Sequence, residues 1–306
     1  MENITLIINP QAGNSRHRKQ IPALVAQLTR LFHIDQTYYT AQDGDARRIA
    51  RGLAPSVNGR CIVIGGDGTL HDTVNGLQES QNQTVAVGYI PTGTGNDYAR
   101  AHGIPLQPNR AIAALRHSRP IVTKIGKAVS PEIGTQYFIN NFGIGIDARI
   151  VYDTNHSETK TGLNRLHLGQ FAYLTNILRA LKNQHGFPAT WQAEQTHFND
   201  RTYLFVFTNH PFLGGGIRLF PDDQRDPDRL SLVMVNKAKW HVLVPILMNI
   251  LSGQSNHPRL HVYRRHHFRF ATTAQEHIQI DGEEFHAPIH VVLSQTNQLM
   301  WLPGTE

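Results

Sequence analysis

Short apolar runs alternate with segments of helical spacing through the first third of the chain, beginning with a strand and ending with a helix. Parallel strands need helical crossovers, so this alternation predicts a doubly wound parallel sheet, that is, an α/β domain. In such sheets, ligands bind beyond the carboxyl ends of the strands. The predicted strands are 4–8, 34–39, 61–64 and 85–90, and the predicted helices are 21–32, 45–53, 70–77 and 96–102.

After about residue 121 the pattern changes to runs in which apolar and polar residues alternate, which predicts an antiparallel β-sandwich. We place the domain boundary at residue 122. The predicted strands of this second, β-rich domain are 137–143, 202–209, 230–236, 260–270, 278–285 and 289–294, and two predicted helices, 169–183 and 240–251, interrupt them.

Composition narrows the environment and the partners. The 29 Lys and Arg outnumber the 23 Asp and Glu, for a net charge of +6, which favours an anionic partner such as a nucleotide or a membrane surface. Nucleic acid is not expected, because no motif of that kind occurs. The single cysteine, Cys61, cannot form an internal disulfide and fits a reducing, cytoplasmic compartment. We expect no signal peptide, no membrane span and no zinc site.

A glycine-rich turn, Gly65 to Thr69, follows the predicted strand 61–64 and leads into a helix. Glycines let the backbone approach a phosphate closely, and the N–H groups at the start of a helix favour an anion. Asp67 cannot help to bind a bare phosphate, so its carboxylate suggests a Mg²⁺ or a substrate hydroxyl nearby. The alternative is a tight turn in which Asp67 caps the helix.

Two more loops of this kind follow neighbouring strands. Residues 91–97, PTGTGND, follow the strand 85–90, and residues 9–14, NPQAGN, follow the first strand. Because parallel strands end at one edge of the sheet, the three loops together predict a nucleotide site there. Neither GxxxxGK[ST] nor GxGxxG follows these strands, which disfavours a P-loop or a dinucleotide site.

Five motifs together carry a family resemblance: NPQAGN, GGDGTLHDTVNG, PTGTGNDYAR, NNFGIGIDA and IDGEEF. Over residues 4 to about 285 the chain resembles the diacylglycerol kinase catalytic-domain family, especially the soluble bacterial lipid kinases. GGDGT alone is shared with NAD kinases, and the second loop and the late DGE separate this chain from them. The resemblance implies a nucleotide-binding domain over 1–122, a lipid-substrate sandwich over 123–294, and a final segment, 295–306, that returns to the first domain.

The resemblance also implies the site. Glu283 is expected to be the proton acceptor, with Asp281 as its partner or rival, although the residues alone favour a hairpin turn with solvated acids. Asp67 would organise Mg²⁺ near the phosphates while a carboxylate of the second domain orients the attacking hydroxyl. His71 and Asp72 stand where these kinases usually carry Asn-Glu. The implied ATP contacts are Asn9, Pro10, Gln11, Ala12, Gly13, Thr40, Gly66, Asp67, Gly68, Thr69, Leu70, His71, Asp72 and Thr94.

A second magnesium site is in question in the run from Asp222 to Leu230. Lipid kinases of this group often bind a structural Mg²⁺ through an Asp-Gly pair here, but Pro227 falls at the position of the ligand aspartate. Asp226 or Asp228 are the candidate substitutes, and a solvated acidic loop is the alternative.

The expected function is an ATP- and Mg²⁺-dependent kinase that transfers the γ-phosphate to a lipid hydroxyl, such as that of diacylglycerol, at the inner face of the membrane. The basic and aromatic stretch 263–270 either contacts anionic headgroups or is a solvated strand with an aromatic core face. Helix 169–183 and loop 211–216 either line an acyl slot or pack in the core. A soluble-substrate kinase of NAD-kinase type and a non-catalytic nucleotide- or lipid-binding regulator remain alternatives, and the lipid and the oligomeric state, including a homodimer, stay open.

Overall fold

The computed structural model divides into two compact units. The first comprises Met1–Ile125, Phe212–Gly216 and Thr296–Glu306, and the second Gly126–Pro211 and Ile217–Gln295. The predicted helix 169–183 and most of the predicted helix 240–251 lie outside the described residues. The structure describes residues 2–13, 15–53, 59–80, 84–156, 186–221, 224–236, 245–246, 249 and 258–303.

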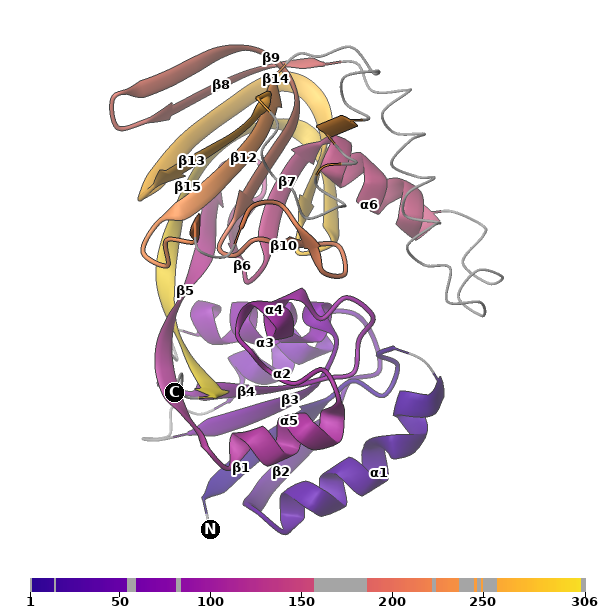
Figure 1. Ribbon diagram of the computed structural model, residues 1–306. Helices are drawn as coiled ribbons and strands as arrows, with labels where there is room; N and C mark the ends of the chain where they lie inside the picture. Colours follow the sequence, from indigo (N-terminus) through magenta and orange to yellow (C-terminus); the bar gives the residue numbers. More distant parts are fainter. Residues whose placement is uncertain are drawn as a thin grey trace. The chain divides into compact units, whose positions relative to one another are not determined.

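The first unit is a parallel sheet with helices on both faces (Figure 1). Its strands run in the order β4-β3-β1-β2, and Met300 near the end of the chain pairs in parallel with Val87 of β4. Helices α1 and α5 pack on one face, and α2 and α3 on the other. The predicted doubly wound α/β fold is confirmed. The elements are β1 (Asn3–Ile8), α1 (Ser15–Thr29), β2 (His33–Tyr39), α2 (Asp45–Arg51), β3 (Arg60–Gly65), α3 (Asp67–Glu79), β4 (Ala86–Pro91), α4 (Asp97–Ala101) and α5 (Pro108–Leu115).

Burial explains why the central strands read as unbroken apolar runs. All residues of β4 are buried, as are the last five of β3, because helices cover both faces. Helix α1 begins at Ser15, earlier than predicted, and α5 was not predicted at all. Pro108 at the start of α5 and the buried Ala111, Ile112 and Leu115 are the signals for that helix.

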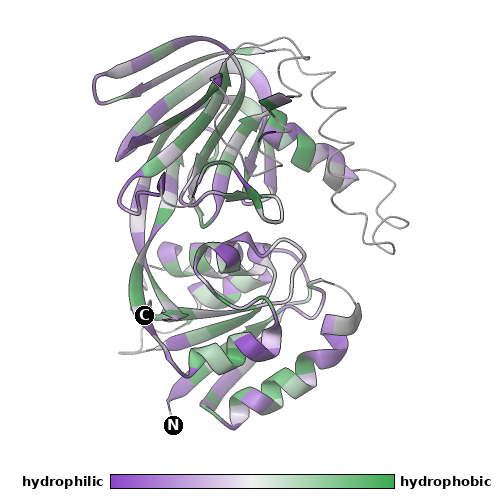
Figure 2. Cartoon of the chain, in the orientation of Figure 1, coloured by the Kyte–Doolittle hydropathy of each residue, from purple (hydrophilic) through white to green (hydrophobic). Residues whose placement is uncertain are grey.

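The second unit is built from antiparallel strands, which confirms the predicted β-rich sandwich. Its core is aromatic, with Trp191, Phe205, Phe207 and Phe268 buried. Hydrophobic and hydrophilic residues alternate along these strands (Figure 2). The elements are residues 126–130 of β5 (Ser118–Ser130), β6 (Gly134–Phe138), β7 (Asn141–Gly145), α6 (Ile146–His156), β8 (Phe187–Ala193), β9 (Thr196–Thr208), β12 (Leu230–Asn236), β13 (Leu260–Arg265), β14 (His267–Ile280) and part of β15 (Glu283–Pro303); β10 (Phe212–Leu213) and β11 (Ile217–Arg218) are short.

Three predicted strands are wrong in extent. Residues 137–143 divide into β6 and β7, and residues 260–270 into β13 and β14. The run 278–285 is a hairpin, since Asp281 and Gly282 have φ of 51° and 98° and Ile280 pairs with Glu283. Two successive residues with positive φ form the tight turn that suits twisted antiparallel strands, and Asp-Gly is a preferred pair for it. Strand β8 and helix α6 were not predicted.

The basic and aromatic stretch 263–270 has two faces in the structure. Phe268 and Phe270 are buried in the core, whereas His267 and Arg269 are exposed. The aromatic side of this segment therefore packs in the core, and its basic side faces solvent. No described helix combines the length and the apolar character that a membrane crossing requires.

Candidate functional site

Two glycine loops touch at the carboxyl edge of the parallel sheet. A Cβ atom placed on Gly93 would lie 2.6 Å from the Cα atom of Gly66, and one placed on Gly66 would lie 3.3 Å from the Cα atom of Gly93. The backbone N–H of Thr92 also donates to the carbonyl of Gly65 at 2.7 Å. The loops after β3 and β4 therefore lie in contact, and their glycines permit it.

The loop after β1 joins them. The side-chain amide of Asn9 donates to the hydroxyl of Thr69 at 3.1 Å, and the backbone N–H of Asn9 donates to the carbonyl of Ile64 at 2.9 Å. Gly13 has φ of 71°, and a Cβ atom there would overlap the carbonyl oxygen of Thr92. Thr40 follows β2 and donates its N–H to the carbonyl of Ile8. All three predicted loops and Thr40 thus belong to one edge.

Asp67 occupies the first turn of α3, and the N-cap residue of that helix is Gly66. Its carboxylate accepts hydrogen bonds from the backbone N–H groups of Asp97, at 3.2 Å, and Tyr98, at 3.4 Å. These are the first residues of α4, so Asp67 caps the neighbouring helix and joins the second glycine loop to the first. The predicted alternative, a cap of its own helix, is wrong.

Asp97 is a second carboxylate beside this edge, and the predicted site did not include it. It is buried, and its Oδ2 accepts the backbone N–H of Gly215 at 3.0 Å. A Cβ atom on Gly95 would lie 3.2 Å from Oδ2 of Asp67 and 4.0 Å from Oδ2 of Asp97. The two carboxylates thus both lie close to one glycine. Asp97 ends the GTGND motif, which is the signal that could have found it.

Gly214, Gly215 and Gly216 all have positive φ, and the segment 212–216 belongs to the first unit, where it lies against α4. The sequence suggested an acyl slot for this loop, whereas the structure connects it through Gly215 to Asp97. Nothing in the local sequence marks that long-range contact.

Several predicted nucleotide contacts differ in accessibility. The side chains of Leu70 and His71 are 0% and 1% exposed, so a ligand at this edge would reach only the main chain of these two residues. The His71 ring lies against the amide of Asn75, at 3.3 Å. Asp72 is half-buried, whereas Gly68 and Thr94 are exposed.

The two acids of the DGE hairpin have different surroundings in the second unit. The carboxylate of Asp281 accepts the backbone N–H groups of Ile139, Asn140 and Asn141 at 2.7, 2.9 and 2.8 Å. In return, the N–H of Asp281 donates to the carbonyl of Asn141 at 3.0 Å. Glu283 is exposed. Asp281 thus fastens the hairpin to the turn between β6 and β7, which leaves Glu283 as the more available acid.

A buried carboxyl lies beneath this hairpin. Asp147 in the first turn of α6 is 3% exposed and accepts a hydrogen bond from Nε2 of Gln279 at 2.6 Å. Burial raises the pKa of Asp147 to about 6, and the hydrogen bond from Gln279 opposes this rise.

We expect the buried Asp147 to make the second unit less stable as the pH rises. Because its folded pKa of about 6 exceeds the ordinary 3.8, its stabilising contribution is complete below about pH 4 and is lost as the pH passes 6. The free energy of unfolding of the Asp147→Asn variant, measured relative to that of the wild type, should therefore rise by about 3 kcal/mol from pH 4 to pH 8. Urea unfolding of both proteins across this range measures the difference, and parallel curves would contradict the prediction.

The acids proposed for a second magnesium have local partners. Oδ1 of Asp226 accepts the N–H of Asp228 at 3.1 Å, and Oδ2 lies 3.4 Å from Nε of Arg229. This is the hydrogen bonding of an exposed acidic turn. The assignment of Mg²⁺ to Asp226 or Asp228 stays a prediction.

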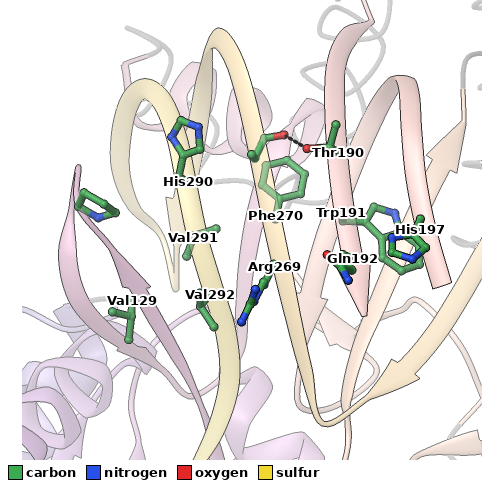
Figure 3. Close-up of a pocket in the computed structure, with 12 residues that line it drawn as sticks. Val129, Thr190, Trp191, Gln192, His197, Arg269, Phe270, His290, Val291 and Val292 are labelled. Carbon is green, nitrogen blue, oxygen red and sulfur yellow. Dashed lines mark hydrogen bonds between the residues drawn. The ribbon is translucent and has the colours of Figure 1, made fainter. Parts of the chain in front are cut away.

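A hollow of about 450 Å³ lies on the sheet surface of the second unit, lined by β5, β8, β9, β14 and β15 (Figure 3). Val292 pairs with Arg269, which pairs in turn with Gln192 on the other side. Val129 and Val292 are 42% and 43% exposed. Hydrogen bonds from Ser130 and His290 lower the pKa of the nearby Glu132 to about 2. None of the predicted site residues lines this hollow.

Comparison with known families identifies the family of this chain. Residues 3–128 match the diacylglycerol kinase catalytic domain, and residues 141–298 match the YegS C-terminal NAD kinase beta sandwich-like domain. The chain belongs to the diacylglycerol kinase catalytic-domain family. This family membership confirms the resemblance read from the five motifs and the expectation of a lipid-kinase-type enzyme.

Relatives of the diacylglycerol kinase family match most of the chain. The diacylglycerol kinase of Bacillus subtilis (strain 168) is 26% identical over 285 residues, which cover 92% of this chain and 90% of the relative. That of Staphylococcus saprophyticus is 27% identical over 280 residues, covering 91% and 88%. A solved structure of a protein assigned as a diacylglycerol kinase from Bacillus anthracis str. Sterne has a TM-score of 0.79 at 24% identity, covering 98% and 97% of the two chains. This last likeness supports the fold.

Proposed function

We propose that the protein is an ATP- and Mg²⁺-dependent lipid kinase that phosphorylates a lipid hydroxyl, such as that of diacylglycerol. The observation that carries this proposal is the meeting of the three glycine loops at one sheet edge, with Asp67 and Asp97 beside them. A nucleotide phosphate needs close backbone approach and N–H donors, and these loops and the start of α3 offer both.

The side chains present at this edge fit a magnesium ion. Mg²⁺ prefers oxygen ligands and usually takes one or two protein carboxylates together with substrate phosphates. Asp67 and Asp97, which both lie close to Gly95, would hold it. When bound, the ion neutralises phosphate charge during the transfer.

Glu283 is the proposed proton acceptor for the attacking lipid hydroxyl. The carboxylate of Asp281 accepts three backbone N–H groups and anchors the hairpin, and these bonds favour its charged form. Glu283 is exposed and held on a rigid two-residue hairpin next to that anchor. A base on a fixed element orients the hydroxyl with little loss of conformational entropy.

A phosphate-transfer assay tests this proposal. Purified protein would be incubated with Mg²⁺, γ-labelled ATP and dispersed lipids that include diacylglycerol, ceramide and monoacylglycerol, with NAD in a separate reaction. We expect label in a lipid, and little in an Asp67→Asn control. Labelling of NAD without any lipid product would point to the soluble-substrate kinase, and tight ATP binding without any transfer would point to a non-catalytic regulator.

We further propose that the hollow of Figure 3 contacts an anionic membrane surface. Two exposed valines, Val129 and Val292, border it beside Arg269, and His267 is exposed on the same strand as Arg269. Apolar side chains with an adjacent cation suit the boundary between headgroups and acyl chains. Glu132 is an acid next to the lining residue Pro131, and its pairing with His290 reduces the repulsion that it would exert.

The Val129→Asp and Val292→Asp variants should each bind vesicles of mixed neutral and anionic phospholipid about tenfold more weakly, because each loses apolar burial of about 1.5 kcal/mol. Co-sedimentation measures the bound fraction. Val122→Asp is the matched control, since Val122 is 62% exposed but belongs to the first unit. Equal binding by all three variants and the wild type would exclude this surface.

A further inference from the structure

Gln279 joins three parts of the hairpin region and performs no reaction step of its own. Its side chain is 2% exposed on β14, two residues before Asp281. Its Oε1 accepts the backbone N–H of Gly282 at 3.0 Å, and its Nε2 donates to Oδ2 of Asp147 at 2.6 Å and to Oδ1 of Asn141. Since Gly282 needs an acceptor and the Asp147 carboxylate a donor, the amide has one satisfactory orientation.

A glycine in the neighbouring strand makes room for this arrangement. Gly143 of β7 lies opposite Gln279 in the strand pairing. A Cβ atom on Gly143 would overlap Oδ2 of Asp147 and lie 2.7 Å from Nε2 of Gln279. The glycine therefore lets the strand approach the pair with its backbone alone, and the two side chains stay in direct contact.

The hairpin is thus held from two sides. Asp281 fastens it to the turn at 139–141 through three N–H groups, and Gln279 holds the next residue, Gly282, through its amide. Gly282 immediately precedes Glu283, so the direction of the Glu283 backbone depends on this bond. A buried hydrogen-bonded pair is rigid because breaking it leaves polar groups unsatisfied.

We propose that Gln279, oriented by Asp147, is a positioning residue that fixes Glu283 for proton transfer. This inference rests on the proposed function, in which Glu283 is the proton acceptor. The Gln279→Glu variant keeps the acceptor for Gly282 but sets a carboxylate oxygen against Asp147 at the place of a 2.6 Å hydrogen bond. Adding Asp147→Asn restores a hydrogen bond across that contact, because the new amide at position 147 can donate to the carboxylate at position 279. Asn141 can do the same if its side-chain amide rotates so that the NH₂ group faces position 279.

The experiment compares four full-length proteins: the wild type, Gln279→Glu, the double variant Gln279→Glu/Asp147→Asn, and Gln136→Glu. Gln136 is the control, a half-buried glutamine of the same unit that donates to the carbonyl of Ile133. We expect the kcat of Gln279→Glu to fall by about tenfold to a hundredfold while its KM for ATP stays unchanged, as for a misplaced catalytic group. The double variant should recover to near the wild-type kcat. A near-normal kcat for Gln279→Glu, or no recovery in the double variant, would overturn the proposal.

Hydrogen exchange of the Gly282 amide separates this inference from the proposed function. Repulsion from the Asp147 carboxylate should move the substituted side chain away from Gly282. The amide should therefore exchange faster in Gln279→Glu than in the wild type, and return toward wild-type protection in the double variant. If the wild type phosphorylates no lipid, the proposed function fails, but the exchange pattern still tests the bond between Gln279 and the Gly282 N–H. Unchanged exchange in Gln279→Glu would show that this bond does not hold the hairpin. If Gln279→Glu does not fold, Gln279→Met, which removes all three side-chain hydrogen bonds without adding charge, should show the same loss of kcat and of protection.

Discussion

Replacing Glu283 with glutamine should lower the rate of phosphate transfer to lipid by about 100- to 10 000-fold, the usual contribution of a general base. Glutamine is close to glutamate in shape but cannot accept the proton of the attacking hydroxyl. Because the glycine loops of the first unit would hold the nucleotide, the affinity for ATP should stay unchanged. Initial rates with labelled ATP and calorimetric titration of ATP measure the two quantities.

Glu284 provides the matched control for this variant. It is the next residue, it is half-buried, and it lies 3.6 Å from His156. Glu284→Gln makes the same chemical change and should keep a near-normal rate. If Glu283→Gln also kept a near-normal rate, Glu283 would not be the base.

Replacing Gly93 with alanine should weaken ATP binding by about tenfold to a hundredfold. The added Cβ atom would lie 2.6 Å from the Cα atom of Gly66 and 3.0 Å from Oδ1 of Asn96, so the two glycine loops must separate. An extra atom in a well-packed contact forces the backbone to shift, at a cost in free energy of about 1–3 kcal/mol. Titration with ATP in the presence of Mg²⁺ measures the loss.

Gly52→Ala serves as the control for that experiment. Gly52 caps α2, and a Cβ atom there would meet its nearest neighbour at 3.5 Å, an ordinary contact. Its ATP affinity should equal that of the wild type. Unchanged affinity in the Gly93→Ala variant would show that the contact between the loops does not shape the nucleotide site.

Local sequence predicted the first unit well because each of its signals is local. Strands 61–64 and 85–90 appear as apolar runs since both faces are covered, and each is followed directly by its glycine loop. The meeting of Gly66 and Gly93 followed from the rule that parallel strands end at one edge. The prediction left out Asp97, although that residue ends the GTGND motif, and local sequence gave no sign of its contact with Gly215, 118 residues away.

The second unit was predicted in class and less well in detail. Apolar and polar residues alternate along 137–143, so nothing local revealed that the strand is interrupted where Asp281 accepts three N–H groups. Asp281 and Glu283 are both acids two residues apart, and sequence alone left open which of them takes a proton. The hydrogen bonds of Asp281 distinguish them, and these depend on a turn more than 130 residues earlier in the chain.

Mapping the bound nucleotide is the most direct test of the central claim that the three glycine loops hold ATP. A photoreactive ATP analogue would be bound with Mg²⁺, irradiated, and located by mass spectrometry of the labelled peptides. We predict labelling within residues 9–13, 66–72 and 92–97, and its loss when excess ATP is present. Labelling that ATP displaces but that falls only on peptides of the second unit, such as 187–208, would contradict the claim.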